Sequence, residues 1–318
     1  MSPIRAWLSG LRRVLRAPGL VLLLWCGSVA ITGLPALAVH DEVRRHLGES
    51  LESEGAASGV NYDWMQEFRE QASPLGQTLR PDVIGFAAVM DNTSALADAS
   101  ARAPAMMAAG AVYVLVLWFL TPGLIQRLAA DRPLGAQAFL GRCGGSAMRL
   151  LRLNVVAAIF YAALFGGLHQ TLFGDLFDTL TRDMTVERSA FLIRLALYAG
   201  FFAVLAGANL LFDYARVRMV VEDRHSLFAS LSAALRFVVE QPRVAIGVYA
   251  LNLLMLLVVL GLYFLVAPGA GTTGWTMWAG FAVSQAYIAA RIATKLAFWA
   301  AEAAALQAAF ACPGFVRR

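Results

Sequence analysis

The sequence predicts an all-α, polytopic membrane helix bundle with six transmembrane helices. Of its 318 residues, 59% are hydrophobic and 15% are charged, with a mean hydropathy of +0.63. A soluble domain is about 45–50% apolar and about 25% charged. The apolar residues are concentrated in runs of about 20, the length that crosses a bilayer. This composition excludes a soluble globular enzyme, a disordered chain and a disulfide-rich secreted module.

Six windows of 21 to 24 residues are long enough to span the hydrocarbon core. As helices they reach roughly 30–36 Å at about 1.5 Å per residue. Backbone groups in lipid must be hydrogen-bonded within the segment, which favours helices. The alternation of apolar and polar residues that marks a membrane β-barrel is missing from the sequence. The predicted spans are residues 19–39, 104–124, 153–173, 191–212, 244–267 and 275–296.

The distribution of charge predicts the orientation. With the N-terminus inside, the inside segments hold 16 basic and 6 acidic residues. The outside segments then hold 7 basic and 15 acidic residues. The positive-inside rule therefore predicts an N-in/C-in arrangement, and we expect a multi-pass protein of the bacterial inner membrane.

The first span resembles a signal sequence. Arg12, Arg13 and Arg16 precede its apolar run, and Ala36-Leu37-Ala38 fits a small-residue cleavage site. However, 18 residues precede the run, and the run is long enough to span. We therefore expect a retained signal anchor, and a cleaved signal peptide is the alternative.

A short pattern recurs ahead of three spans. Leu, Arg, Val and Pro occupy the same offsets in Gly10–Pro18 and Ala234–Pro242, and Ala147–Arg152 repeats the Arg without the Pro. Each segment predicts an amphipathic inner-surface helix, with arginine toward headgroups and apolar residues toward acyl chains. Proline would end the helix before the span. We expect three repeated hairpins, each preceded by such a helix.

We expect a single integral membrane domain over 1–318, with an extracytoplasmic helical insert over 40–103. The insert carries a net charge of −6. Trp64, Met65 and Phe68 recur in it at helical spacing. Helices are predicted over Asp41–Glu54, over Asn61–Ala72 and from Pro81. The alternative is a solvated acidic spacer whose aromatic residues rest on the membrane surface.

Sequence motifs for catalysis are missing. The sequence contains no Gly-x4-Gly-Lys-Ser/Thr, no His-Glu-x-x-His and no Gly-x-Ser-x-Gly. The four histidines are scattered, and the three cysteines have no metal-ligand spacing. We therefore predict no catalytic, cofactor-binding or metal-binding residues, no cofactor and no nucleic-acid partner.

Polar residues inside the predicted spans form one candidate site. Asn209, Asn252 and Gln285 could line a polar path or binding site, because such groups are costly in lipid and often functional. The alternative is hydrogen bonding between helices, worth about 0.6 kcal/mol each.

The inner segment 213–243 forms a second candidate, a headgroup- or partner-binding surface. The alternative is local ion pairing at helical spacing, between Asp213 and Arg216 and between Arg218 and Glu222. The candidate surface consists of Asp213, Arg216, Arg218, Arg224 and Arg236.

The same segment carries a resemblance to known proteins. The run Asp213-Tyr214-Ala215-Arg216-Val217-Arg218, followed by Glu222-Asp223-Arg224, Ala233-Ala234-Leu235-Arg236 and Pro242, resembles uncharacterised bacterial multi-pass membrane proteins. More faintly, it is similar to the six-helix membrane region of some glycerophosphodiester phosphodiesterases. The resemblance implies a six-helix architecture and no catalytic residues.

Two functions are favoured by these patterns, and a lipid-modifying enzyme is a third interpretation, for which the sequence offers no nucleophile or metal cluster. The first is a non-enzymatic scaffold or accessory protein of the cell envelope, with membrane lipids and an envelope protein as partners. The second is a small transporter or permease, suggested by the repeat and by the polar residues within the spans.

Overall fold

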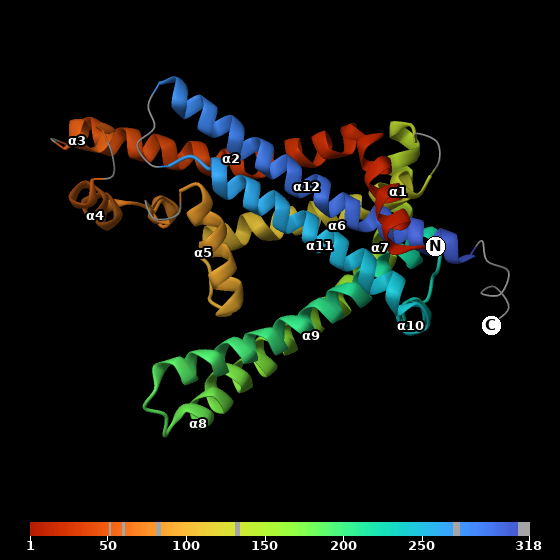
Figure 1. Ribbon diagram of the computed structural model, residues 1–318. Helices are drawn as coiled ribbons and strands as arrows, with labels where there is room; N and C mark the ends of the chain where they lie inside the picture. Colours follow the sequence, from red (N-terminus) through yellow and green to blue (C-terminus); the bar gives the residue numbers. More distant parts are fainter. Residues whose placement is uncertain (51, 59–60, 81–83, 131–133, 270–273, 311–318) are drawn as a thin grey trace. The chain divides into compact units, whose positions relative to one another are not determined.

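The computed structural model describes residues 1–318 except 51, 59–60, 81–83, 131–133, 270–273 and 311–318 (Figure 1). The described residues form helices and connecting segments without any strand, as the sequence predicts. In chain order the long helices are α1 (Pro3–Leu15), α2 (Pro18–Glu49), α4 (Tyr62–Gln71), α5 (Phe86–Ala97), α6 (Pro104–Ala129), α7 (Ala136–Ala163), α9 (Glu187–Val221), α10 (Leu227–Glu240), α11 (Pro242–Val266) and α12 (Trp275–Phe310). Shorter elements are α3 (Ser53–Ser58), η1 (Gly76–Thr78), η3 (Leu164–Leu168), η4 (Thr171–Leu176) and α8 (Phe177–Thr181).

Five helical segments of the described chain are long and apolar enough to cross a membrane, and they indicate a membrane protein. They are Pro18–Gly48, Pro104–Ala129, Ala136–Thr181, Glu187–Val221 and Pro242–Val266. The sixth predicted window, 275–296, lies within α12. It contains Gln285, Arg291 and Lys295, and α12 is not among the five.

The chain divides into two compact units. The first contains Met1–Arg16, Trp118–Asn252 and the chain from Ala297 onward, and the second contains Ala17–Leu117 and Leu253–Leu296. Helices α6, α11 and α12 therefore contribute to both units.

In the first unit, the helices α7 and α9 form an antiparallel hairpin (Figure 1). Helix continues from α7 through η3, η4 and α8 to Thr181, and α9 begins at Glu187. The predicted outside loop 174–190 is therefore mostly helical. Elements η3 and η4 are π-helical, a form that widens a helix locally and is frequent at functional positions.

Short helices precede two of the spans, as the recurring pattern predicts. Helix α1 ends at Leu15 and α2 begins with Pro18, while α10 ends at Glu240 and α11 begins with Pro242. The residue before each proline has nearly the same backbone geometry, φ −131° and ψ 53° at Ala17 and φ −127° and ψ 50° at Gln241. Helix α7 has no such proline and continues unbroken past Arg152.

In the second unit, the 40–103 insert packs on an extension of α2. The predicted helix Asp41–Glu54 is not separate, because residues 41–49 continue α2 without a break. Trp64 and Phe68 of α4 are buried in a small cluster, with Val43 and Leu47 of α2 packed against it. The Trp64 indole donates to Nδ1 of His46 at 3.1 Å.

The remaining predicted helix of the insert begins later than expected. Its predicted start, Pro81, lies outside the described residues, and helix α5 begins at Phe86.

The Glu42 carboxylate of α2 accepts hydrogen bonds from the backbone N–H and hydroxyl of Ser73, at 2.5 and 2.8 Å. These contacts fix the loop after α4 to α2, so the described part of the insert is a packed structure.

Close packing of α1 on α12 leads to a stability prediction. A Cβ added at Gly10 would lie 2.5 Å from the backbone nitrogen and 2.6 Å from the Cα of Ala301. Because backbone atoms cannot move aside easily, we expect Gly10→Ala to destabilise the protein by about 1–3 kcal/mol. Thermal unfolding of the detergent-solubilised protein measures the effect.

Gly144→Ala is the matched control, because nothing lies within 4 Å of a Cβ added there. Alanine is favoured over glycine in a helix by about 0.5–1 kcal/mol. The control should therefore unfold at the same or a higher temperature. An equal rise of the unfolding temperature in both variants would contradict the close contact between α1 and α12.

Candidate functional site

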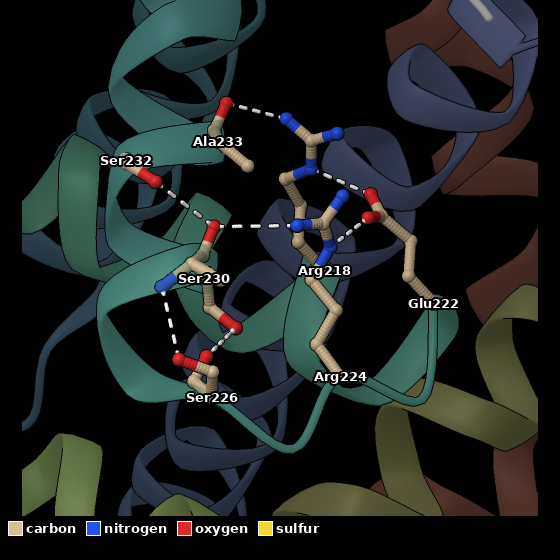
Figure 2. Close-up of polar contacts among 8 residues, drawn as sticks. Arg218, Glu222, Arg224, Ser226, Ser230, Ser232 and Ala233 are labelled. Atoms are coloured by element: carbon tan, nitrogen blue, oxygen red, sulfur yellow. Dashed lines mark hydrogen bonds and ion pairs between the residues drawn. The ribbon is translucent and has the colours of Figure 1, made fainter.

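Arg218 is a buried charged residue near the C-terminal end of α9. Its side chain is 5% exposed and donates to Oε1 of Glu222 at 2.5 Å. It also donates to the carbonyl oxygen of Ala233 in α10, as Figure 2 shows. Its guanidinium carbon lies 5.4 Å from the centre of the Phe310 ring. The guanidinium therefore joins α9 to α10 and to the end of α12.

Glu222 binds two arginines at once. Its second carboxylate oxygen accepts from Nε of Arg224, whose guanidinium also donates to the carbonyl oxygen of Ala229 at 3.3 Å (Figure 2). Removing one partner of a buried ion pair leaves an uncompensated charge, which is strongly destabilising. The pairing of Glu222 with both arginines therefore fixes the turn between α9 and α10.

The start of α10 is fixed by its own serines. The Ser226 hydroxyl accepts from the backbone N–H of Ala229 at 3.4 Å, which caps the helix. The Ser230 hydroxyl donates to the carbonyl oxygen of Ser226 at 2.9 Å. The chain reaches this cap through Asp223, which has a positive φ of 52°. Asparagine and aspartate tolerate this conformation better than most residues.

Asp223 also links this turn to α7. Its carboxylate accepts from Arg149 at 2.7 Å. This hydrogen bond and the charge of Arg149 lower the pKa of Asp223 below its ordinary value of 3.8. Charged residues of both helices of the hairpin therefore contact the segment that leads from α9 into α10.

A second polar cluster lies further along α9. Asp213 accepts from Arg216 at 2.5 Å, and Arg216 also donates to Oδ1 of Asn154 in α7 at 3.2 Å. The Tyr161 hydroxyl donates to Oδ1 of Asn209 at 2.5 Å. These bonds join α7 to α9 at two levels, so the polar side chains cross-link the helices of the hairpin.

The three polar residues predicted within the spans have different environments. Asn209 is bonded to Tyr161, as described above. Asn252 is fully buried, and neither atom of its amide has a hydrogen-bond partner among the described residues. Gln285 belongs to the second unit, where its side-chain oxygen accepts from Trp25 at 3.0 Å.

The residues of the predicted headgroup surface divide into two groups. Four of them, Asp213, Arg216, Arg218 and Arg224, form hydrogen bonds or ion pairs within the fold. Both ion pairs expected from helical spacing, Asp213–Arg216 and Arg218–Glu222, are formed. Arg236 is exposed on α10.

A pocket lies between α1 and the C-terminal end of α6, and the sequence predicts only part of its lining. Its volume is about 760 Å³, and Arg5, Arg12, Arg13, Arg16 and Arg127 line it. The sequence pattern places three of these arginines, Arg12, Arg13 and Arg16, on an inner-surface helix. No local signal indicates Arg127, because it comes from a helix more than 100 residues away.

Within the described ranges, no group of three or more His, Cys, Asp or Glu side chains could hold a metal ion. Comparison of the chain with protein-family models, with curated proteins and with solved structures gave no match. The resemblance of the 213–242 stretch to other membrane proteins stays a prediction.

The contacts of Glu222 lead to a second stability prediction. Glu222→Gln keeps the shape of the side chain but leaves Arg218 buried without its carboxylate. We expect this variant to lose about 3–5 kcal/mol of unfolding free energy at neutral pH, the range for breaking a buried pair. Denaturant unfolding in detergent micelles measures it.

Glu240→Gln is the control, because Glu240 is exposed at the end of α10. Exposed substitutions change stability by about 0.5 kcal/mol or less. If both variants unfolded at the same denaturant concentration, the ion pairs of Glu222 would not hold α9 and α10 together.

Proposed function

We propose that the chain is a multi-pass protein of the bacterial inner membrane that acts as a non-enzymatic scaffold or accessory protein of the cell envelope. The observation that carries this proposal is the pairing of the charged residues at the inner end of α9. Asp213, Arg218 and Glu222 hold neighbouring helices together rather than lining a path. A scaffold requires such a fixed inner surface, whereas a transporter requires polar groups that a substrate can reach.

A three-hairpin architecture is part of the proposal. Gly10, Ala147 and Ala234 occupy the same place in the recurring pattern, and all three are buried. The matching backbone angles at Ala17 and Gln241 also support a common origin for the first and third copies. In this arrangement α12 is the sixth span, and Arg291 and Lys295 extend toward the inner headgroups.

The surface of α10 provides the contact that a scaffold needs. Phe228, Leu235 and Val239 recur at i, i+7 and i+11 and are strongly exposed. The exposed Arg236 lies on the adjacent face of the helix. Apolar residues beside arginine are suited to a leaflet surface or to the apolar face of an envelope protein.

The membrane topology is the first test of the proposal. A reporter that is active only in the periplasm should work when fused within the 40–103 insert. A reporter that fluoresces only in the cytoplasm should work when fused after residue 318, because the positive-inside rule places both ends inside. Activity of the periplasmic reporter at residue 318 would exclude six spans with an internal C-terminus.

The alternative function, a small transporter or permease, is favoured by one observation, the bare amide of Asn252. Such a buried polar group inside a span could bind a polar substrate. It could equally be a structural defect, in which case an apolar residue of similar size would stabilise the protein.

Asn252→Leu separates the two functions. If the protein is a scaffold, the variant should be more stable than the wild type by about 1–3 kcal/mol of unfolding free energy and should therefore unfold at a higher temperature. It should also fully complement a deletion strain under envelope stress. Asn209→Leu is the control for a polar residue with a bond, and it should be destabilised by loss of the Tyr161 contact. Loss of complementation by a well-folded Asn252→Leu protein would favour the transporter.

A further inference from the structure

Helix α1 has three distinct faces. Ala6, Gly10 and Val14 form a buried face, which packs on α12 at Ala301. Ile4, Leu8 and Leu15 form an apolar face, and Ile4 and Leu15 are 59% and 71% exposed. Arg5, Arg12 and Arg16 recur at i, i+7 and i+11, so at about 100° per residue they lie within about 40° of one another on a third face.

The arginine face forms one wall of the 760 Å³ pocket. The opposite wall comes from the end of α6, where Arg127 contributes a further guanidinium. The other polar side chains in its described lining are Arg13 and Ser9. No acidic residue is among the described residues that line the pocket, so positive charge converges on it from two helices.

Arg13 fixes the two walls in place. Its guanidinium donates to the carbonyl oxygen of Leu128 in α6 at 3.2 Å and to Oε1 of Gln307 in α12 at 2.8 Å. The Gln307 amide in turn donates to the carbonyl oxygen of Ala129 at 3.0 Å. The pocket therefore has a preformed frame, and its shape does not depend on a ligand to bring α1 and α6 together.

The chemistry of the lining selects an anion. Arginine stays charged at all physiological pH values, so guanidinium groups around one pocket repel each other unless an anion lies between them. The planar fork of guanidinium matches the oxygens of phosphate, which accept paired hydrogen bonds from it. A volume of about 760 Å³ lies in the range of small-molecule sites, about 300–1,000 Å³.

The neighbouring face of α1 indicates where the phosphate comes from. Exposed apolar residues beside an arginine face are the arrangement of a helix lying in the membrane interface, with its apolar side in the acyl chains. Ile4, Leu8 and Leu15 would contact acyl chains while the arginines reach the headgroup of the same lipid. We infer that the α1–α6 pocket binds the phosphate of an anionic phospholipid headgroup in the inner leaflet. This site is separate from the α9–α10 contacts, and the inference requires membrane insertion but not a scaffold function.

The test measures binding to the purified full-length protein. Phosphatidylglycerol, phosphatidylcholine, inorganic phosphate and pyrophosphate are each titrated, and the unfolding temperature and the bound lipid are recorded. Wild-type protein should be stabilised by phosphatidylglycerol and not by phosphatidylcholine. The variant Arg12→Gln/Arg16→Gln should bind phosphatidylglycerol roughly thirtyfold more weakly, which is about 2 kcal/mol for two arginines near an anionic surface.

Arg142→Gln/Arg243→Gln is the matched control, because it removes two exposed arginines of α7 and α11 that do not line the pocket. It should keep wild-type affinity. Arg127→Gln is a second test variant that leaves α1 unchanged, so loss of binding in it cannot come from loss of the α1 helix. The unfolding temperature of each variant without ligand shows that it is folded.

Each outcome decides the inference. Selective loss of phosphatidylglycerol binding in the pocket variants supports the lipid site. Stabilisation of the wild type by phosphate or pyrophosphate alone, lost in the same variants, would support a phosphate pocket but overturn the lipid as its source. Equal binding of phosphatidylglycerol by the pocket variants and the control would overturn the site, since the attraction would then be general surface charge.

Discussion

The cost of removing a guanidinium group from water governs the arrangement of the charged residues in this chain. An arginine cannot lose its charge, so near a membrane it must either pair inside the protein or reach the headgroups. Arg218 is paired inside the protein, where it contacts Glu222, a backbone carbonyl and an aromatic ring. Arg12 and Arg16 instead line a pocket, and the lipid site that we propose there would be the second arrangement. The arginines therefore belong to two kinds of site, a paired one at the end of α9 and a pocket beside α1.

Pairing explains why the C-terminal part of α9 tolerates so many charged residues. Asp213 and Glu222 each pair with an arginine of α9 and connect through it to a neighbouring element. Glu222 reaches α10 through Arg218, and Asp213 reaches α7 through Arg216 and Asn154. Ion pairs of this kind add little net stability over an apolar core, but they allow few alternative arrangements. We therefore regard them as determinants of helix register.

The sequence predicts the features that depend on neighbouring residues. The helix boundaries at Pro18 and Pro242 follow from the missing proline N–H, and the Arg218–Glu222 pair follows from i, i+4 spacing. The prediction of a separate helix from Asp41 was wrong, because a change from apolar to polar residues alters the environment of a helix without breaking it. The position of Arg127 beside α1 depends on tertiary packing, for which one sequence gives no local signal. Whether α12 crosses the membrane depends on the free energy of placing Gln285, Arg291 and Lys295 in lipid. The periodicity of apolar residues does not measure this free energy.

The comparison of α1 with α10 shows how one pattern can acquire two roles. Arg13 of α1 and Phe237 of α10 occupy the same place in the recurring pattern. Phe237 is buried, and its ring lies 5.1 Å from that of Tyr214, so α10 is sealed against α9 by aromatic contact. Arg13 instead reaches two carbonyl-type oxygens on α6 and α12. The Arg13 guanidinium makes the contact of α1 with α6 and α12 polar, and the pocket lies beside this contact. The difference at this position therefore accompanies an aromatic interface on α10 and a polar one on α1, where Arg5 and Arg16 also stand in the places of Ala229 and Glu240.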